Sequence, residues 1–197
     1  MKWTTLVFAI LSLTACAAGP AKNDHSQPAH AASSQKQVVK FDDKVFSRKF
    51  VGDPPNADKL IEFVQESESF DNWTYLIGFR YQQLPRINND PRLAAVSMAR
   101  IVKATNPDAN SSVMIDKANT SAMVDFITWP KSVEYLEFNV FRYIKSQDGN
   151  GVVSVQFARR FDFKSKPTVN EFKALRSSWL NQAANFDMNI ARDLVGQ

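Results

Sequence analysis

The stretch VEYLEFNVFRYIKSQDGNGVVSVQFARRFDF, residues 133–163, decides the fold that we expect. Apolar and polar residues alternate along both of its arms, which is the period of a β-strand with one buried face. Between the arms, Asp148-Gly149-Asn150-Gly151 supplies residues that accept positive φ in tight turns. The stretch therefore predicts a long antiparallel hairpin whose buried face is formed by Leu136, Phe138, Val140, Ile144, Val153, Val155, Phe157, Phe161 and Phe163. Arg159 interrupts this face, so we expect it near a strand end or at a bulge.

Segments on either side of the hairpin extend the sheet and add helices. Strand-like patterns occur at residues 38–50 (a strand or a hairpin), 59–65, 73–81, 112–117 and 122–129. One helix is expected to begin at Asn89-Asp90-Pro91, and a second at the capping box that runs from Thr168 to Glu171. The sequence thus predicts one α+β domain over residues 38–197. It would be a mainly antiparallel sheet of about five to seven strands, with two helices packed on one side of it.

The first fifteen residues have the pattern of an export leader. Lys2 gives a minimal positive start, and the apolar run that follows is too short to span a bilayer as a helix, which needs roughly 20 residues. The four residues Leu13-Thr14-Ala15-Cys16 resemble the lipobox of bacterial lipoproteins. That resemblance implies that Cys16 is lipidated and that the leader, residues 1–15, is removed. Ala17 follows the cysteine where an Asp would suggest inner-membrane retention, so we expect a lipid anchor on the periplasmic face of the outer membrane.

Residues 16–37 are expected to form a flexible tether between the anchor and the domain. The segment is rich in small and polar residues and has no large apolar residue, so it cannot bury a core. His25 and His30, the two histidines of the chain, both lie in it. We interpret them as solvated tether residues rather than metal ligands.

Composition excludes several classes of chemistry. The net charge of +4 is mild and no basic stripe is evident, so no nucleic-acid partner is expected. Within residues 38–197 the sequence contains no His and no Cys, which excludes Ser-His-Asp and Cys-His machinery and ordinary zinc sites. The chain has only six glycines and none of the glycine-rich phosphate loops. We therefore expect no cofactor and no metal.

Two catalytic arrangements remain open from the sequence. Glu66, Glu68 and Asp71 cluster between two predicted strands and could act as an acid and base pair in a hydrolase, although a polar turn is the favoured explanation for them. Ser-Lys catalysis is conceivable at Ser165-Lys166 or at Lys131-Ser132, but adjacency alone is weak support.

Basic residues suggest a possible interaction surface. We expect a group of them at the far end of the central hairpin, where they could meet lipid head groups or an acidic partner, or could simply be solvated. The group comprises Arg142, Lys145, Arg159, Arg160, Lys164 and Lys166. A separate set of aromatic residues could line a ligand face or pack at the core margins with the hydroxyls outward, namely Tyr75, Tyr81, Tyr135 and Tyr143.

Two further resemblances concern the body of the protein. The segment ESESFDNWT, residues 66–74, is similar to a segment of small uncharacterised exported proteins of Gram-negative bacteria. The layout of strands and helices resembles the architecture of PsbP-like and Mog1-like domains, which implies an assembly or binding role without catalytic residues. Fold alone does not establish function.

These observations favour a membrane-anchored, non-catalytic binding or assembly module whose partner is another envelope protein. The alternatives are a carrier or sensor of a small amphiphile and a carboxylate-dependent hydrolase.

Overall fold

The computed structural model describes residues 37–52, 54 and 58–197. Residues 38–197 form one compact unit. The expectations for the leader, for Cys16 and for His25 and His30 lie outside the described residues. No helix in the described part of the chain is long and apolar enough to cross a membrane.

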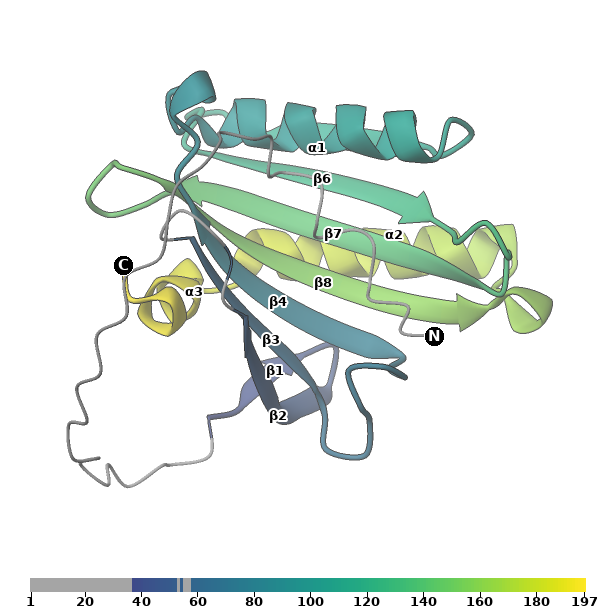
Figure 1. Cartoon of the computed structure of the whole chain (residues 1–197). Coiled ribbons are helices and arrows are strands. Elements are labelled where there is room, and N and C mark those ends of the chain that lie inside the picture. The colour runs from purple at the N-terminus through teal and green to yellow at the C-terminus, as the bar shows by residue number, and fades with distance from the viewer. Residues whose placement is uncertain (1–36, 53, 55–57) are drawn as a thin grey trace, which may run out of the picture. The chain divides into compact units, whose positions relative to one another are not determined.

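The described residues build a single eight-stranded antiparallel sheet with the strand order β1-β2-β3-β4-β8-β7-β6-β5 (Figure 1). In chain order the strands are β1 Val39–Phe41, β2 Lys44–Gly52, β3 Lys59–Gln65, β4 Tyr75–Gln82, β5 Ser111–Ile115, β6 Ser121–Thr128, β7 Tyr135–Lys145 and β8 Val152–Asp162. The predicted α+β class with a mainly antiparallel sheet is confirmed.

The strand count of five to seven was too low, because the segment 38–50 makes two strands. Asp42 and Asp43 both have positive φ, 50° and 57°, and join β1 to β2 in a tight two-residue turn. Of the two alternatives for this segment, a strand or a hairpin, the structure shows the hairpin, although Asn-Gly or Asp-Gly is the usual pair at such a turn.

The central hairpin has the predicted turn. β7 and β8 pair without a register shift from Tyr135↔Asp162 to Lys145↔Val152, so there is no bulge at Arg159. Gly149 takes a φ of 76° in the turn, where the Asp148 carboxylate accepts from the Asn150 amide at 2.9 Å. Phe163 is not in the strand; it begins the short 3-10 helix η2, Phe163–Ser165.

Three helices lie in the described residues, one more than predicted, and they cover both faces of the sheet rather than one. The helix α1, Pro91–Thr105, runs along the β5–β7 end of the sheet, while α2, Val169–Asn185, lies behind β7 and β8 (Figure 1). A third helix, α3, Met188–Val195, packs against β3, β4 and β8. The expected C-terminal helix divides because Asp187 caps a new helix, its side chain accepting from the Asn189 amide at 3.0 Å.

The main core lies between the sheet and the helices α2 and α3, on what we call the apolar face. Trp179 of α2 is 1% exposed, and its ring packs against Phe41 and Phe138 at centroid distances of 5.2 and 5.5 Å. Phe157 stacks on Phe41 at 3.8 Å. Every second residue of the central strands contributes to this face, as the alternation in residues 133–163 predicted.

Candidate functional site

Buried polar side chains form a band on the opposite face of the sheet. Glu62 of β3, Gly78 of β4 and Gln156 of β8 are partners in register, so they lie side by side on this face. Neighbouring positions of the same face add further polar groups from β4, β7 and β8. We call the set the polar row: Glu62, Arg80, Glu137, Asn139, Gln156 and Arg160.

A continuous hydrogen-bond chain links four members of the polar row. The Arg160 Nε donates to Glu137 Oε2 at 3.0 Å, and Asn139 Nδ2 donates to Glu137 Oε1 at 3.2 Å. The Gln156 Nε2 in turn donates to Asn139 Oδ1 at 2.7 Å. Glu137, Asn139 and Gln156 are 3%, 0% and 3% exposed. Buried polar side chains normally have partners, and this chain satisfies all but its last oxygen.

That last oxygen is Oε1 of Gln156, which is buried and accepts no hydrogen bond from the residues that the structure describes. It lies beside Gly78, where an added Cβ would meet it at 3.2 Å. A glycine in the interior of a central strand removes one side chain from the face and commonly marks a close approach. The Gln156 side chain therefore takes the space that a side chain at position 78 would need, and its Oε1 is buried there without a donor among the described residues.

Glu62 lies on the other side of Gly78. Burial raises the pKa of the Glu62 carboxyl to about 7, Arg80 opposes this shift, and Glu137 reinforces it. Glu62 accepts no hydrogen bond from any described residue. A carboxyl group that titrates near neutrality beside an unsatisfied carbonyl is typical of a functional site rather than of a stabilising one.

Aromatic rings hold one end of the polar row. The Arg160 guanidinium lies 3.8 Å from the ring centre of Trp73 and 4.5 Å from that of Tyr135. Trp73 is 4% exposed and packs over a small cluster of Val64, Leu76 and Ala158 on the same face. Because these contacts restrain Arg160, the Glu137 carboxylate that it binds is held in one position.

The structure does not bring together the basic residues predicted to form one surface. Arg142 and Lys145 lie toward the turn of the central hairpin, whereas Arg159 and Arg160 lie toward its opposite end, on alternate faces. Arg142 donates to the carbonyls of Ala183, Ala184 and Phe186 at 3.2, 2.8 and 3.0 Å and so caps the end of α2. Arg159 lies over the rings of Tyr75 and Phe161. The remaining two, Lys164 and Lys166, are exposed around η2.

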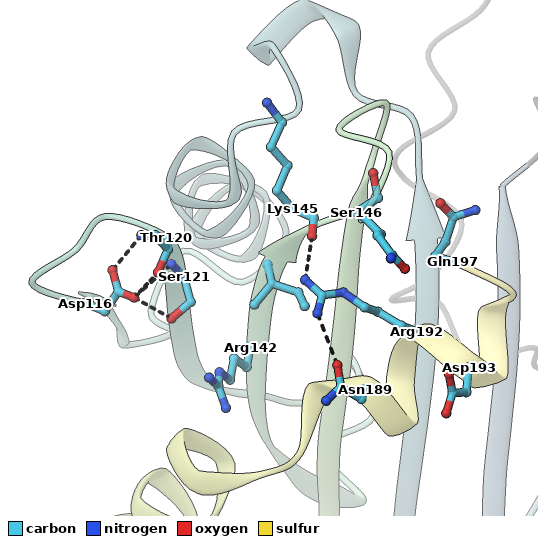
Figure 2. Close-up of a pocket in the computed structure, with 12 residues that line it drawn as sticks. Asp116, Thr120, Ser121, Arg142, Lys145, Ser146, Asn189, Arg192, Asp193 and Gln197 are labelled. Atoms are coloured by element: carbon cyan, nitrogen blue, oxygen red, sulfur yellow. Dashed lines mark hydrogen bonds between the residues drawn. The ribbon is translucent and has the colours of Figure 1, made fainter.

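An open pocket of about 620 Å³ lies where the end of β7 meets α3 (Figure 2). Arg192 crosses it, with Nη1 donating to Asn189 Oδ1 at 3.3 Å and Nη2 to the Lys145 carbonyl at 3.4 Å. Asp116 accepts from Thr120 and Ser121. These groups bond one another in part, but the Arg192 Nε is buried without a hydrogen-bond partner among the described residues, so the pocket keeps one unsatisfied donor.

The acidic loop after β3 does not present a buried carboxylate pair. Glu66 and Asp71 are exposed, and Glu68 accepts from the Thr74 amide at 2.8 Å, which closes the loop. Lys131, Ser132, Ser165 and Lys166 are likewise exposed. The polar-turn interpretation accounts for the loop residues.

The tyrosines do not share one environment. Tyr81 and Tyr143 are each 4% exposed, so their hydroxyls do not point outward into solvent as expected. Burial raises the pKa of Tyr143 well above its usual range. Tyr75 packs on the apolar face against Trp179 at a centroid distance of 6.2 Å, while Tyr135 supports Arg160.

Sequence reasoning did not single out the polar row. Glu137, Asn139, Ser154 and Gln156 occupy the polar positions of the alternating pattern, and such positions are normally assigned to solvent. The available signal was compositional: Asn139 and the mid-strand Gly78 are of residue types that are depleted in strands. No group of three His, Cys, Asp or Glu residues that could hold a metal occurs among the described positions.

Comparison with known proteins gives a single result. The model of an uncharacterised protein family matches residues 33–188, a range that includes every strand of the sheet together with α1 and α2. No curated protein and no solved structure matches the chain significantly.

Proposed function

The chain belongs to this uncharacterised family, and from that premise we propose that it is a lipid-anchored, non-catalytic binding module of the cell envelope. The anchor would be Cys16, and the binding site would be the polar row of the folded body. The lipobox-like residues 13–16 and the polar composition of residues 16–37 support the anchor and its tether. Ala17 after the cysteine favours the outer membrane, with the body in the periplasm.

The observation that carries the binding role is the unsatisfied Oε1 of Gln156 at the end of an otherwise complete hydrogen-bond chain. An unpaired buried acceptor costs roughly 1–3 kcal/mol, so it does not serve stability. A ligand that donates to this oxygen would recover that free energy on binding. Buried polar groups of this kind, held rigidly by Asn139 and Glu137, are the usual source of orientation and specificity in a binding site.

The residue types of the body support binding rather than catalysis. Histidine occurs only at positions 25 and 30 and cysteine only at position 16, so residues 38–197 contain neither of these nucleophile or base types. Glu62 could act as a base, but the nearby phenol of Tyr143 has a raised pKa and is therefore poorly suited to act as a nucleophile.

Mass spectrometry of the protein extracted from membranes tests the anchor. We expect a chain that begins at Cys16 and carries diacylglyceryl and acyl groups, and a Cys16→Ser variant that stays unlipidated. A native chain that retains residues 1–15, or that lacks lipid, would overturn the anchor.

Native mass spectrometry of the gently extracted protein tests the binding role. We expect wild-type protein to carry a bound adduct that is lost in Gly78→Val, because a side chain at Gly78 would push aside the Gln156 amide, whose Oε1 lies 3.2 Å from the Cβ position. Gly149→Asn is the matched control, since position 149 lies in an exposed turn and Asn accepts its positive φ. Bare protein in every sample, or an adduct that survives Gly78→Val, would refute binding at the polar row.

A further inference from the structure

The outer side of α1 is basic and exposed. Its inner side packs on β5, β6 and β7 through the buried residues Pro91, Ala94, Ala95, Met98 and Val102. The helical repeat places a second set of residues on the opposite side, which we call the α1 face: Leu93, Val96, Arg100, Lys103 and Ala104. All of these except the half-buried Val96 are exposed, and no acidic residue occurs between Pro91 and Thr105. Figure 1 shows no other described element outside α1 on this side of the sheet.

The net positive charge of the described residues is concentrated in α1 and in the short 3-10 helix η1, Pro85–Ile87, that precedes it. The described residues contain 21 basic and 18 acidic side chains. Residues 85–105 contribute four of the basic ones, at positions 86, 92, 100 and 103, but a single acidic one, Asp90. All other described residues are balanced, with 17 side chains of each sign. The charge excess is therefore local rather than spread over the body.

The two cations of the α1 face have no carboxylate partner. Neither Arg100 nor Lys103 makes an ion pair or a side-chain hydrogen bond with the described residues, whereas Arg92 binds Asp90 at the helix start. Asp108 is the first acidic residue after the helix and is exposed. The helix dipole favours a cation in the last turn, which accounts for Lys103 but not for Arg100. The charge of the α1 face is thus open to an anion from outside the protein.

The proposed anchor would keep the α1 face within reach of a membrane. In the sequence, 21 residues separate Cys16 from Val38, and the sheet begins at Val39. Since β1 and β5 are its two edges, seven strand spacings of about 4.8 Å put them roughly 34 Å apart. A chain of 21 residues can extend to roughly 70 Å, so it is long enough for the edge that carries α1 to meet the lipids that hold Cys16. Such tethering raises the local lipid concentration, so that weak contacts are sufficient.

We infer that the α1 face docks on the surface of an anionic phospholipid bilayer. This inference rests on the proposed function, because the lipid anchor supplies the nearby membrane, but it does not involve the polar row. The cations are spread along the helix rather than converging on one point, which suits an extended anionic surface better than a single small anion. Each cation close to such a surface strengthens binding about fivefold. Leu93, which is 45% exposed, adds an apolar contact at the head groups.

Spin labelling of the anchored protein tests the inference. Cys16 is the only cysteine of the chain and is blocked by lipid in the proposed function, so Ala104→Cys provides a single labelling site on the α1 face. The lipidated variant is reconstituted into vesicles of phosphatidylcholine alone or of equimolar phosphatidylcholine and phosphatidylglycerol. Collisions of the label with oxygen, which concentrates in the bilayer, are compared with collisions with a water-soluble nickel chelate.

We expect the label at position 104 to contact lipid in the anionic vesicles and to stay in water in the phosphatidylcholine vesicles. Ser177→Cys, at an exposed position of α2 on the other side of the sheet, is the matched labelling site and should stay in water in both. A label at position 104 that stays in water in both kinds of vesicle would overturn the inference.

Removing the charges tests the cause of the contact. In the Ala104→Cys background, the pair Arg100→Gln and Lys103→Gln leaves a good helix former at each position. The pair is expected to lower the ratio of docked to undocked protein at least tenfold. Lys164→Gln with Lys173→Gln removes the same charge from exposed positions in η2 and α2 and should leave the ratio unchanged. An equal loss in both double variants would refute docking through the α1 face, since net charge would then be the cause.

The outcomes separate this inference from the proposed function. Lipidated protein whose label stays in water would reject the docking and leave the anchor intact. A chain found without lipid would reject the anchor. Binding of that chain to added anionic vesicles, lost in Arg100→Gln with Lys103→Gln, would then support the docking by itself, and equal binding of both chains would reject it. A label that stays in water on vesicles but is shielded in native membranes would assign the α1 face to an acidic protein and overturn the docking on lipid.

Discussion

The two faces of the sheet use the same strands for opposite purposes. On the apolar face, Phe138, Phe157 and Trp179 pack into one continuous core beneath α2 and α3. On the other face, the same strands β7 and β8 bury Glu137, Asn139 and Gln156. Burying apolar area stabilises a fold, whereas burying polar groups costs free energy unless every group is paired. The comparison teaches that one face is mainly apolar beneath α2 and α3, whereas the other combines an apolar part under α1 with the buried members of the polar row on β7 and β8.

The largest expected effect is on the apolar face. Trp179→Ala removes a ring that is 1% exposed and in contact with Phe41 and Phe138. We expect a loss of about 3–5 kcal/mol in the free energy of unfolding, measured by urea denaturation. Val169→Ala, at a position of the same helix that is 70% exposed, is the control and should change stability little. A loss below about 1 kcal/mol for Trp179→Ala would contradict the assignment of the core to this face.

A substitution on the polar face should raise the free energy of unfolding rather than lower it. The pKa of Glu62 is raised from 4.5 to about 7 in the folded state. The free energy of unfolding therefore falls as the pH rises from 4.5 to 7, because the unfolded state ionises first, and it is constant above that range. Glu62→Gln should remove this slope and stabilise the protein at pH 8 by on the order of 3 kcal/mol. Denaturation at pH 4, 6 and 8 measures the slope. An equally steep slope in the variant would show that Glu62 is not its source, and Glu134→Gln should leave the slope unchanged.

The apolar face contains one ion pair that sharpens the comparison. Asp125 is 4% exposed and accepts from Arg176 of α2 at 2.6 and 2.8 Å. Arg176→Met should cost about 2 kcal/mol, less than the 3–5 kcal/mol of a fully buried pair because the Arg176 side chain is 35% exposed. The double variant Arg176→Met, Asp125→Leu should recover most of this loss in thermal unfolding. A double variant no more stable than the single one would argue against an unpaired charge as the cause.

The smallest effect concerns the start of the helix that covers the apolar face. Thr168 and Glu171 form a reciprocal capping box, in which the Thr168 amide donates to Glu171 Oε2 at 2.8 Å. Thr168→Ala should lower the free energy of unfolding by about 1 kcal/mol. Ser177→Ala, in the exposed interior of the same helix, provides the comparison in chemical denaturation. An equal effect at both positions would mean that capping does not contribute.

Elements with a local signal were predictable. The capping box at Thr168, the N-cap at Asp90 and the turn at 148–151 all depend on residues within a few positions of one another, and each is present. The division between α2 and α3 was not predicted, although Asp187 is of a residue type that caps helix starts. The sequence left open whether residues 38–50 form a strand or a hairpin, because Asp42-Asp43 is an unusual pair for a hairpin turn, and the structure shows the hairpin.

The polar row could not be predicted in the same way. Its members come from β3, β4, β7 and β8, and their proximity depends on the strand order and on register between segments far apart in the chain. The separation of Arg142 from Arg160 has the same origin. A one-residue change of register would move each side chain to the other face, so periodicity alone cannot say which polar residues meet.

The sequence by itself determined the α+β class, the long hairpin and the helix starts, because periodicity, capping and turn chemistry act over a few residues. Only the tertiary structure decided that β3, β4 and β8 lie side by side, which leaves Glu62 and Gln156 facing each other across a glycine. Pairing between distant strands is set by the packing of the whole core, and that packing also determines which polar groups are removed from water.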